Sequence, residues 1–574
     1  MPDQLGFSRA VALTILLSLA ATLLLAGTAA FPLLDRDEAR FARGTIEMLD
    51  RGDWIGPHFN DESFVGEPPL TYWLMSAGYG ALGYNELGAR LYSVIAAIGM
   101  TALIFLFGHR VAGKSAAFAA AFAWLTCSQV FLLGRLAIAD MSMILAITVI
   151  HWALWELLFE DGGRAFEIAL WLAAAGGFLA AGPAALITPV ITLAVLRAAT
   201  GPDQLNWRRT AASWGLPLAL TLVGIWAVPM LRTGDATWSI DPGVGSPAPT
   251  YYLAAIFVSL FPWSPNFGQF AKALRGRWRD RRTAFLLSWI IGPLVILGFS
   301  AGQFSEYLPA MLPALLLLLF RHGYDPTTFG LPSRWFYWGL HATAAIALLG
   351  VAVYGKWIDV PAQLRDLKIA AAALAGALLA LQAAAVLFAR APLRRLNQLA
   401  APTLLVVVAA SATHVFAFTI RPITAPLRLL PYYDHVEPSA LHTATGYAEP
   451  SLVFYADRNW RLNSQPTRSE IAVGGLFVYG GAEWGMRQLF SPGAEETRRQ
   501  AVASCGTVAA AATSTASSAR AVVDERAQAA GAPAFLIESD LSRAVVCGFN
   551  FGRLTWTEVV VFYRESTSRS PARP

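Results

Sequence analysis

The sequence predicts an α-helical polytopic membrane protein with about thirteen transmembrane helices and a small C-terminal α/β domain. Three observations lead to this fold class. Of the 574 residues, 56% are hydrophobic and only 14% are charged, whereas average proteins carry about 25% charge. Apolar stretches long enough, or nearly long enough, to cross a bilayer recur up to about residue 420. Beyond that residue the composition changes to short β-rich runs alternating with helix-like stretches.

The predicted spans are joined by short connections, apart from one long loop at residues 32–86. They lie at residues 10–31, 87–107, 115–134, 138–159, 166–180, 184–199, 211–230, 249–265, 283–301, 307–320, 335–354, 369–389 and 399–420. Arginine and lysine gather in alternate loops, as at Arg110 with Lys114 and at Arg208 with Arg209. The positive-inside rule places those loops and the N-terminus in the cytoplasm. The loop at 32–86 and the region 421–574 are then expected outside.

We therefore expect a transmembrane domain at residues 1–420 and an exterior α/β domain at residues 421–574. The β-rich runs in the second domain are Ser451–Tyr455, Leu476–Tyr479, Ala534–Ile537 and Glu558–Tyr563, and a helix-like stretch covers residues 495–503. Cys505 and Cys547 are the only cysteines in this domain. An oxidising compartment would permit a disulfide between them, which we predict.

The first exterior loop is the best candidate for a working surface. Between Asp35 and Glu67 it carries nine carboxylates and four arginines, and a connector between two membrane helices needs only a few residues. The Pro68-Pro69 pair that follows prevents a helix from running through and gives the loop a fixed path.

Asp35, Asp37 and Glu38 lie at the start of this loop, near the membrane surface. A carboxylate there can act as a general base for an acceptor hydroxyl or phosphate, or can hold a cation. The same residues also form a good acidic first turn of a helix, and both interpretations stay open. Arg40 follows Asp37 by three residues, so one helical face can carry an acid and a cation together.

Asp140 is a second candidate, at the exterior end of the span at 138–159. An ionisable group beside an apolar span indicates function, but an ordinary helix cap explains it equally well.

One motif is a decoy. Residues 108–115 match the phosphate-binding pattern G-x-x-x-x-G-K-[ST], which requires a preceding strand and a soluble α/β core. We predict a tight cytoplasmic turn between two membrane helices.

Several blocks of the chain resemble the polyprenyl-phosphate-dependent GT-C glycosyltransferases. The closest likeness is to the branch that includes the lipid A aminoarabinose transferases and bacterial relatives of protein mannosyltransferases. The blocks are Asp35–Arg43, Glu47–Trp54, Pro68–Leu74, Gly88-x-Arg90, Arg135 with Asp140, Gly177–Pro183, Phe261–Ser264, Tyr307–Pro313, Glu449–Tyr455 and Gly548–Asn550.

The resemblance implies a GT-C type enzyme of the bacterial inner membrane, with a periplasmic active site and a periplasmic C-terminal domain. It would move a hexosyl or pentosyl unit from an undecaprenyl-phosphate carrier to lipid A or another lipid or glycan acceptor. Asp37 maps to the family's candidate catalytic base, and Asp140 and Arg40 map to its supporting residues. The candidate substrate-binding residues are Asp35, Glu38, Phe64, Arg135, Arg232 and Tyr307. We expect no nucleic-acid partner.

Two family lysines that would hold the carrier phosphate are missing. The family often reads Glu-Lys-Pro-Pro where this chain has Gly66-Glu67-Pro68-Pro69, and Thr-Lys-Gly-Pro where it has Ala180-Ala181-Gly182-Pro183. Arg232, Arg135 or a bound metal can compensate, with Glu67 as a metal ligand. We favour a divalent cation (Mg, Mn or Zn) bridged by Glu67 and Asp37 over direct substitution by an arginine.

Two other function classes compete with the enzyme. A transporter or flippase predicts repeated halves and ionisable groups deep within spans, whereas this chain gathers its charges in exterior loops. A non-catalytic scaffold on the same fold stays open because of the missing lysines.

Overall fold

The computed structural model describes the chain in twenty segments. They are residues 8–29, 32–34, 37–60, 62–63, 68–160, 162–200, 215–232, 255–256, 259–260, 263–264, 274, 277, 280–299, 305–322, 442–447, 449–456, 460–469, 476–485, 517–550 and 555–563. The chain divides into two compact units. The helical unit takes its described residues from Met1–Ala29, Asp53–Gly56 and Phe64–Ala412, and the sheet unit takes its described residues from Ala30–Gly52, Pro57–Ser63 and Thr413–Pro574.

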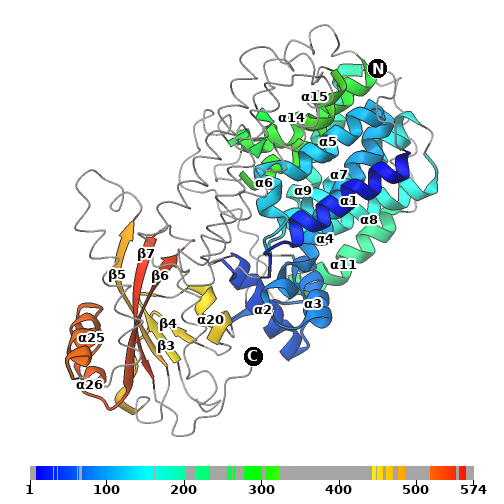
Figure 1. Cartoon of the computed structure of the whole chain (residues 1–574). Helices are drawn as coiled ribbons and strands as arrows, with labels where there is room; N and C mark the ends of the chain where they lie inside the picture. Colours follow the sequence, from blue (N-terminus) through cyan, green and yellow to red (C-terminus); the bar gives the residue numbers. More distant parts are fainter. Residues whose placement is uncertain are drawn as a thin grey trace, which may run out of the picture. The chain divides into compact units, whose positions relative to one another are not determined.

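The helical unit is built from apolar helices whose positions, with the exception of α3, follow the predicted spans (Figure 1). They are α1 (Arg9–Leu25), α3 (Leu70–Leu82), α4 (Glu86–Ala112), α5 (Lys114–Thr126), α6 (Ser128–Leu133), α7 (Asp140–Phe159), α8 (Arg164–Ala181), α9 (Ala184–Thr200), α11 (Gly215–Arg232), α14 (Arg281–Phe299), η3 (Ser305–Met311) and α15 (Leu312–His322). Of the described helices, α4, α7, α8 and α11 are long and apolar enough to cross a membrane.

The structure adds detail to one predicted span and to the predicted loop. The predicted span at 115–134 is broken at Cys127, whose extended backbone (φ −69, ψ 136) separates α5 from α6. The predicted loop at 32–86 contains two helices, α2 (Asp37–Arg51) and the apolar α3. The predicted spans at 335–354, 369–389 and 399–420 lie outside the described residues, so the count of thirteen stays a prediction.

The core of the helical unit forms around α4 and α7, which pack against most of the other described helices. Buried aromatic rings fill the space between α7 and α14, where His151 stacks on Trp289 at a centroid distance of 4.1 Å. Such ring pairs stabilise a core beyond the area they bury.

The decoy motif at 108–115 joins α4 to α5 through Gly113 (φ +86), as predicted for a tight turn between helices.

A close glycine contact explains one of the family blocks. A Cβ atom on Gly88 of α4 would lie 2.5 Å from the carbonyl oxygen of Gly83, at the end of α3, and 3.0 Å from the Tyr79 ring of α3. No larger residue fits there without moving the backbone. Gly88 in the Gly88-x-Arg90 block therefore serves the packing of α3 on α4.

The sheet unit combines the acidic helix of the first loop with a C-terminal sheet (Figure 1). Helix α2 is followed by a short hairpin of β1 (His58–Phe59) and β2 (Glu62–Ser63). The sheet has the strand order β4-β3-β5-β7-β6. Its elements are β3 (His442–Thr445), α20 (Pro450–Ala456), β4 (Trp460–Leu462), β5 (Phe477–Gly485), α25 (Ser517–Ala529), α26 (Ala534–Ile537), β6 (Ser542–Asn550) and β7 (Thr555–Tyr563).

Both faces of this sheet are covered. Strand β3 pairs in parallel with β4 and β5, and β7 pairs antiparallel with β5 and β6. Because strand side chains alternate between faces, Val559 and Val561 pack on the α20 side, and Val560 and Phe562 pack on the α25 and α26 side.

Two of the predicted β-rich runs are helices. Ser451–Tyr455 lies in α20 and Ala534–Ile537 forms α26. Each helix begins at or just after a proline (Pro450 and Pro533), whose fixed φ favours a first helical turn. The runs at Leu476–Tyr479 and Glu558–Tyr563 are confirmed as strands, in β5 and β7. The stretch at 495–503 and Cys505 lie outside the described residues, so the predicted disulfide with Cys547 stays a prediction.

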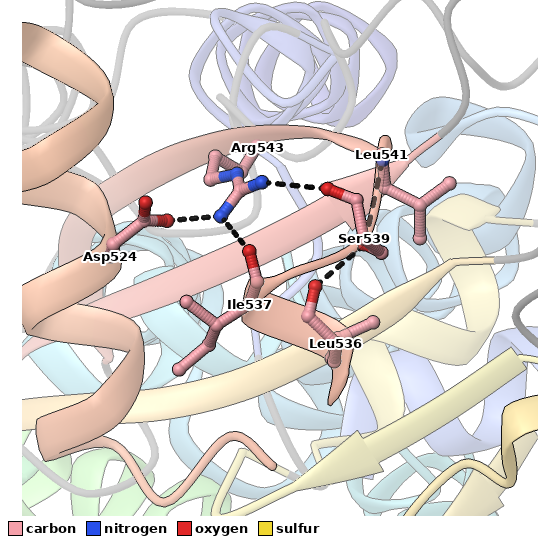
Figure 2. Close-up of polar contacts among 6 residues, drawn as sticks. All are labelled: Asp524, Leu536, Ile537, Ser539, Leu541 and Arg543. Atoms are coloured by element: carbon pink, nitrogen blue, oxygen red, sulfur yellow. Dashed lines mark hydrogen bonds and ion pairs between the residues drawn. The ribbon is translucent and has the colours of Figure 1, made fainter. Parts of the chain in front are cut away.

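Arg543 fastens α25 and the end of α26 to strand β6. Its side chain is only 3% exposed and pairs with Asp524 of α25. It also donates to the carbonyl oxygens of Ile537 and Ser539, at 2.7 and 3.1 Å. Figure 2 shows the guanidinium pointing at all three acceptors. The cation thus satisfies carbonyl groups at the C-terminal end of α26.

Candidate active site

Asp37 and Arg40 stand together at the exposed start of α2, as predicted. Asp37 is the first helical residue and its side chain is 64% exposed, while an Arg40 guanidinium nitrogen lies 3.0 Å from its Oδ1. A carboxylate is stabilised at a helix N-terminus by the helix dipole. The pair offers a solvent-accessible proton acceptor beside a fixed positive charge, which suits transfer to or from an anionic leaving group.

Glu38 has a different local environment from Asp37. Its side chain is buried, and its Oε2 accepts a hydrogen bond from the Leu34 backbone N–H at 2.9 Å. The Ala39 N–H in turn bonds to the Leu34 carbonyl. The capping interpretation of the acidic turn therefore holds for Glu38, whereas Asp37 is the carboxylate that solvent and ligands can reach.

A buried network further along α2 was not predicted from the sequence. Arg43 and Glu47 form an ion pair of 2.9 Å with both side chains almost fully buried. Glu47 Oε1 also accepts from the Asn60 backbone N–H at 2.9 Å. The Asn60 side chain donates to the Trp460 carbonyl (2.5 Å) and accepts from the Trp460 N–H (2.6 Å). This network joins the first loop to strand β4 of the C-terminal sheet.

The N-terminal end of α2 has its own link to the C-terminal region. The Leu33 backbone N–H donates to the Tyr455 hydroxyl at 2.8 Å. Tyr455 lies in α20, which packs against α2. The only sequence signal for these contacts is that Glu47 and Tyr455 both fall in blocks with family resemblance.

In the helical unit, Asp140 is the first residue of α7 and is buried. Arg135 precedes it in the turn after α6 and is half-buried. Arg135 donates to the Thr28 hydroxyl (2.9 Å) and the Ala26 carbonyl (2.6 Å) at the C-terminal end of α1. The buried Arg90 donates to the Thr28 carbonyl at 2.9 Å.

These contacts give Arg135 a structural role as well as a charge. Burial, followed by the charge of the neighbouring Arg90, lowers the pKa of the Arg135 guanidinium to about 10. The group is therefore still protonated at neutral pH. Cations at a helix C-terminus are favourable, so both arginines stabilise the end of α1 and keep a positive potential beside it.

The end of α8, where the family often has the second lysine, lies beside α11. Ala181 is the last residue of α8 and packs against the core, and Gly182 follows with φ +67. Leu179 lies in one apolar cluster with Trp226 and Met230 of α11. Arg232 is exposed at the C-terminal end of α11, two residues beyond Met230. This places a cation at the same end of the helix pair as Ala181.

The remaining candidates are described only in part. Asp35, Phe64 and Glu67 lie outside the described residues, and Tyr307 is described only as a backbone position in η3. Within the part of the chain that the structure describes, no group of three or more His, Cys, Asp or Glu side chains could hold a metal ion. The cation bridged by Glu67 and Asp37 therefore stays a prediction.

Comparison with known proteins identifies relatives. A model of the dolichyl-phosphate-mannose-protein mannosyltransferase family matches residues 66–228. The undecaprenyl phosphate-alpha-4-amino-4-deoxy-L-arabinose arabinosyl transferase of Erwinia tasmaniensis is 26% identical over 314 residues, which are 50% of this chain and 55% of the relative. The transferase of the same name from Pseudomonas aeruginosa is 29% identical over 306 residues, which are 49% and 54% of the two chains. The matches thus span little more than half of each relative.

Among solved structures, ArnT from Cupriavidus metallidurans in the apo state superposes with a TM-score of 0.66 at 19% identity, covering 82% of this chain and 93% of that chain. The same protein bound to undecaprenyl phosphate gives a TM-score of 0.65 at 19% identity, covering 82% and 92%.

The likeness to ArnT shows that this chain has a helical polytopic membrane fold. The arabinosyl transferases and the family model confirm the resemblance to the lipid A aminoarabinose transferase branch of the polyprenyl-phosphate-dependent glycosyltransferases.

Proposed function

We propose that this protein is a membrane glycosyltransferase that moves a sugar from an undecaprenyl-phosphate carrier to lipid A or another envelope lipid or glycan. The observation that carries the proposal is the match to undecaprenyl phosphate-dependent arabinosyl transferases over half of the chain. The family model matches residues 66–228, which include Asp140 and the Gly182-Pro183 turn. The shared fold with ArnT extends along 82% of the chain and supports the same assignment.

In the proposed reaction, an acceptor oxygen attacks the anomeric carbon of the carrier-linked sugar. A new C–O bond forms there while the bond to the carrier phosphate breaks, and the phosphate leaves with the electron pair. Asp37 accepts the proton of the acceptor hydroxyl, because it is the exposed carboxylate in the first turn of the acidic helix, beside Arg40. Arg40 orients the Asp37 carboxylate through their 3.0 Å ion pair, and Asp140 and Arg135 support substrate binding.

The carrier phosphate regains charge as it leaves and needs a cation. The end of α11 that packs on α8 carries the exposed Arg232. We assign the binding of the carrier phosphate to this arginine. The alternative is a divalent cation held by Glu67 and Asp37. Transfer measured in a strong chelator, followed by titration with Mg, Mn and Zn, separates the two routes. Unchanged activity in the chelator excludes the bridged cation.

We further propose an inner-membrane location with thirteen spans, a cytoplasmic N-terminus and a periplasmic domain at 421–574. The alternation of arginine-rich and acidic loops supports this arrangement.

The direct experiment is reconstitution of the purified chain with undecaprenyl phosphate-linked 4-amino-4-deoxy-L-arabinose and lipid A. We expect a mass shift of the acceptor by one glycosyl unit. Mass spectrometry of envelope lipids and glycans from cells with and without the protein tests for other acceptors. A scaffold predicts no lost glycosyl unit in that comparison, and a flippase predicts no mass shift of the acceptor in the reconstituted reaction.

A further inference from the structure

We propose that Asn60 and Tyr455 are positioning residues for Asp37, and that through them the C-terminal sheet sets where the catalytic carboxylate stands. This inference rests on the proposed function and adds to it a role for the C-terminal region. It is carried by the contacts of α2, all of which lie within the sheet unit.

The first step is the rigidity of α2 itself. Asp37 starts the helix, and the buried Arg43–Glu47 pair lies two to three turns further along the same helix. Because a hydrogen-bonded helix transmits a shift of one end to the other, whatever fixes Glu47 also fixes Asp37. Glu47 is fixed from outside the helix by the Asn60 backbone N–H.

The second step is the fit of Asn60 to strand β4. Trp460 lies in the strand at the end of the sheet order, where it pairs in parallel with His442 of β3. The Asn60 amide bonds both the N–H and the C=O of Trp460, as a neighbouring strand would. Its backbone has φ +57, a conformation that asparagine tolerates better than most residues. The conformation and the two-way hydrogen bonding together explain an asparagine here.

The third step is the second tether. The Leu33 N–H to Tyr455 hydroxyl bond holds the chain just before α2. Glu38 then caps the helix through Leu34. Asp37 is therefore held from both sides by residues that contact the C-terminal region, 400 and 422 positions away in sequence.

Asn60→Asp tests the inference with almost no change in shape. The substitution keeps an acceptor for the Trp460 N–H but places a carboxylate oxygen against the Trp460 carbonyl. We expect kcat to fall about 10- to 100-fold, since a shift of about 1 Å in a catalytic group can cost 10²-fold. KM for the carrier-linked donor should change less than about twofold. Tyr455→Phe should lower kcat in the same way but less, and Tyr84→Phe, at an exposed tyrosine of the helical unit, should leave it unchanged.

A double-mutant comparison separates positioning from general damage. In the Asp37→Asn background, Asn60→Asp should produce no further loss of the residual rate, because it acts through Asp37. An equal fold-loss in both backgrounds would overturn the inference. Transfer that is lost in Asp37→Asn but normal in Asn60→Asp overturns the positioning role and leaves the proposed function standing. Wild-type protein without any transfer activity contradicts the proposed function instead.

Hydrogen exchange of the purified full chain gives a readout independent of activity. Amides of Asp37–Arg51 should exchange faster in Asn60→Asp and in Tyr455→Phe, while those of α4 and α7 are unchanged. Should Asn60→Asp fail to fold, Tyr455→Phe carries both measurements, because it removes a single hydroxyl. Unchanged exchange in α2 in a folded variant would refute the tether.

Discussion

At the scale of single residues, two carboxylates that are adjacent in sequence have separate roles. Asp37 is exposed and paired with Arg40, whereas Glu38 is buried and caps the helix start. The difference follows from helical geometry, since consecutive residues point about 100° apart and Glu38 is the one that faces the buried side of α2. The sequence alone left the catalytic and the capping interpretations open for both.

Asp37→Asn should lower transfer by about 10²–10⁴-fold while leaving the protein folded. The amide keeps the shape of the carboxylate but cannot accept the acceptor's proton. The matched control is Asp50→Asn, at an exposed carboxylate near the other end of α2, which should keep full activity. Transfer assays on both purified variants, alongside melting curves, decide the assignment. A near-normal rate in Asp37→Asn would rule out Asp37 as the base.

Arg232→Gln should raise KM for the carrier-linked donor about tenfold, because it removes the cation assigned to the carrier phosphate. Arg232→Lys should restore most of the affinity. Arg164→Gln removes an exposed arginine at the opposite end of α8 and should have no effect on KM. An unchanged KM in Arg232→Gln would shift the assignment to the bridged cation.

At the scale of elements, packing explains where the sequence prediction succeeded and where it failed. Most of the described apolar helices agree with the predicted spans, because about twenty apolar residues in a row have few other stable arrangements. The apolar helix α3 was not predicted. The prediction of strands was wrong for the two runs that form α20 and α26, because short apolar segments carry no decisive periodicity. In both, the preceding proline was the local signal for a helix start.

Arg543→Met should destabilise the sheet unit by about 3 kcal/mol, because it leaves Asp524 without its ion-pair partner and two carbonyls without a donor (Figure 2). Arg461→Met, at an exposed arginine of β4, is the matched control and should change stability little. Thermal unfolding and hydrogen exchange of β6 measure the difference. Equal melting of the two variants would show that the Arg543 contacts contribute no net stability.

The start of α14 should show a pH-dependent contribution to stability. Burial raises the pKa of the Asp280 carboxyl, but hydrogen bonds from Thr283 and the charge of Arg321 lower it more, so the net pKa lies below its ordinary value. A carboxyl whose pKa is lower in the folded state stabilises the fold at pH values above its unfolded pKa of about 3.9. This stabilisation is lost as the pH falls through the folded pKa.

Asp280→Asn should therefore melt below the wild type at pH 7, and the gap should narrow as the pH falls below the unfolded pKa of about 3.9. Glu160→Gln, which removes an exposed carboxylate at the end of α7, is the control for the loss of a charge. Melting of detergent-solubilised protein from pH 7 downwards is the measurement. A gap that stays constant as the pH falls would show that the ionised form is not what stabilises the helix start.

At the scale of the whole molecule, part of the acidic loop and the C-terminal region form one compact unit. Helix α2 and the β1–β2 hairpin belong to the sheet unit, while the segment Asp53–Gly56 belongs to the helical unit. Two indoles hold that segment, since Trp73 and Trp226 donate to the carbonyls of Trp54 and Ile55. The predicted boundary at 420/421 lies outside the described residues.

The topology predicts that the acidic loop and the C-terminal domain are on the same side of the membrane. Reporter fusions after residue 430 should be active only for an exterior tag, because the arginine-rich loops alternate with the acidic ones. A fusion after residue 200 should report the cytoplasm and serves as the internal control. A cytoplasmic signal after residue 430 would break the proposed periplasmic site.

The sequence by itself determined the helical membrane class, the family resemblance and the Asp37–Arg40 pair, since three-residue spacing on a helix brings side chains together whatever surrounds them. Only the tertiary structure decided which carboxylate is buried, that Arg135 and Arg90 serve the end of α1, and that Asn60 and Tyr455 hold α2. These contacts join residues up to 422 positions apart. Hydrogen bonds between a side chain and a distant backbone leave no periodic pattern in the sequence, because one polar residue at one place is enough to make them.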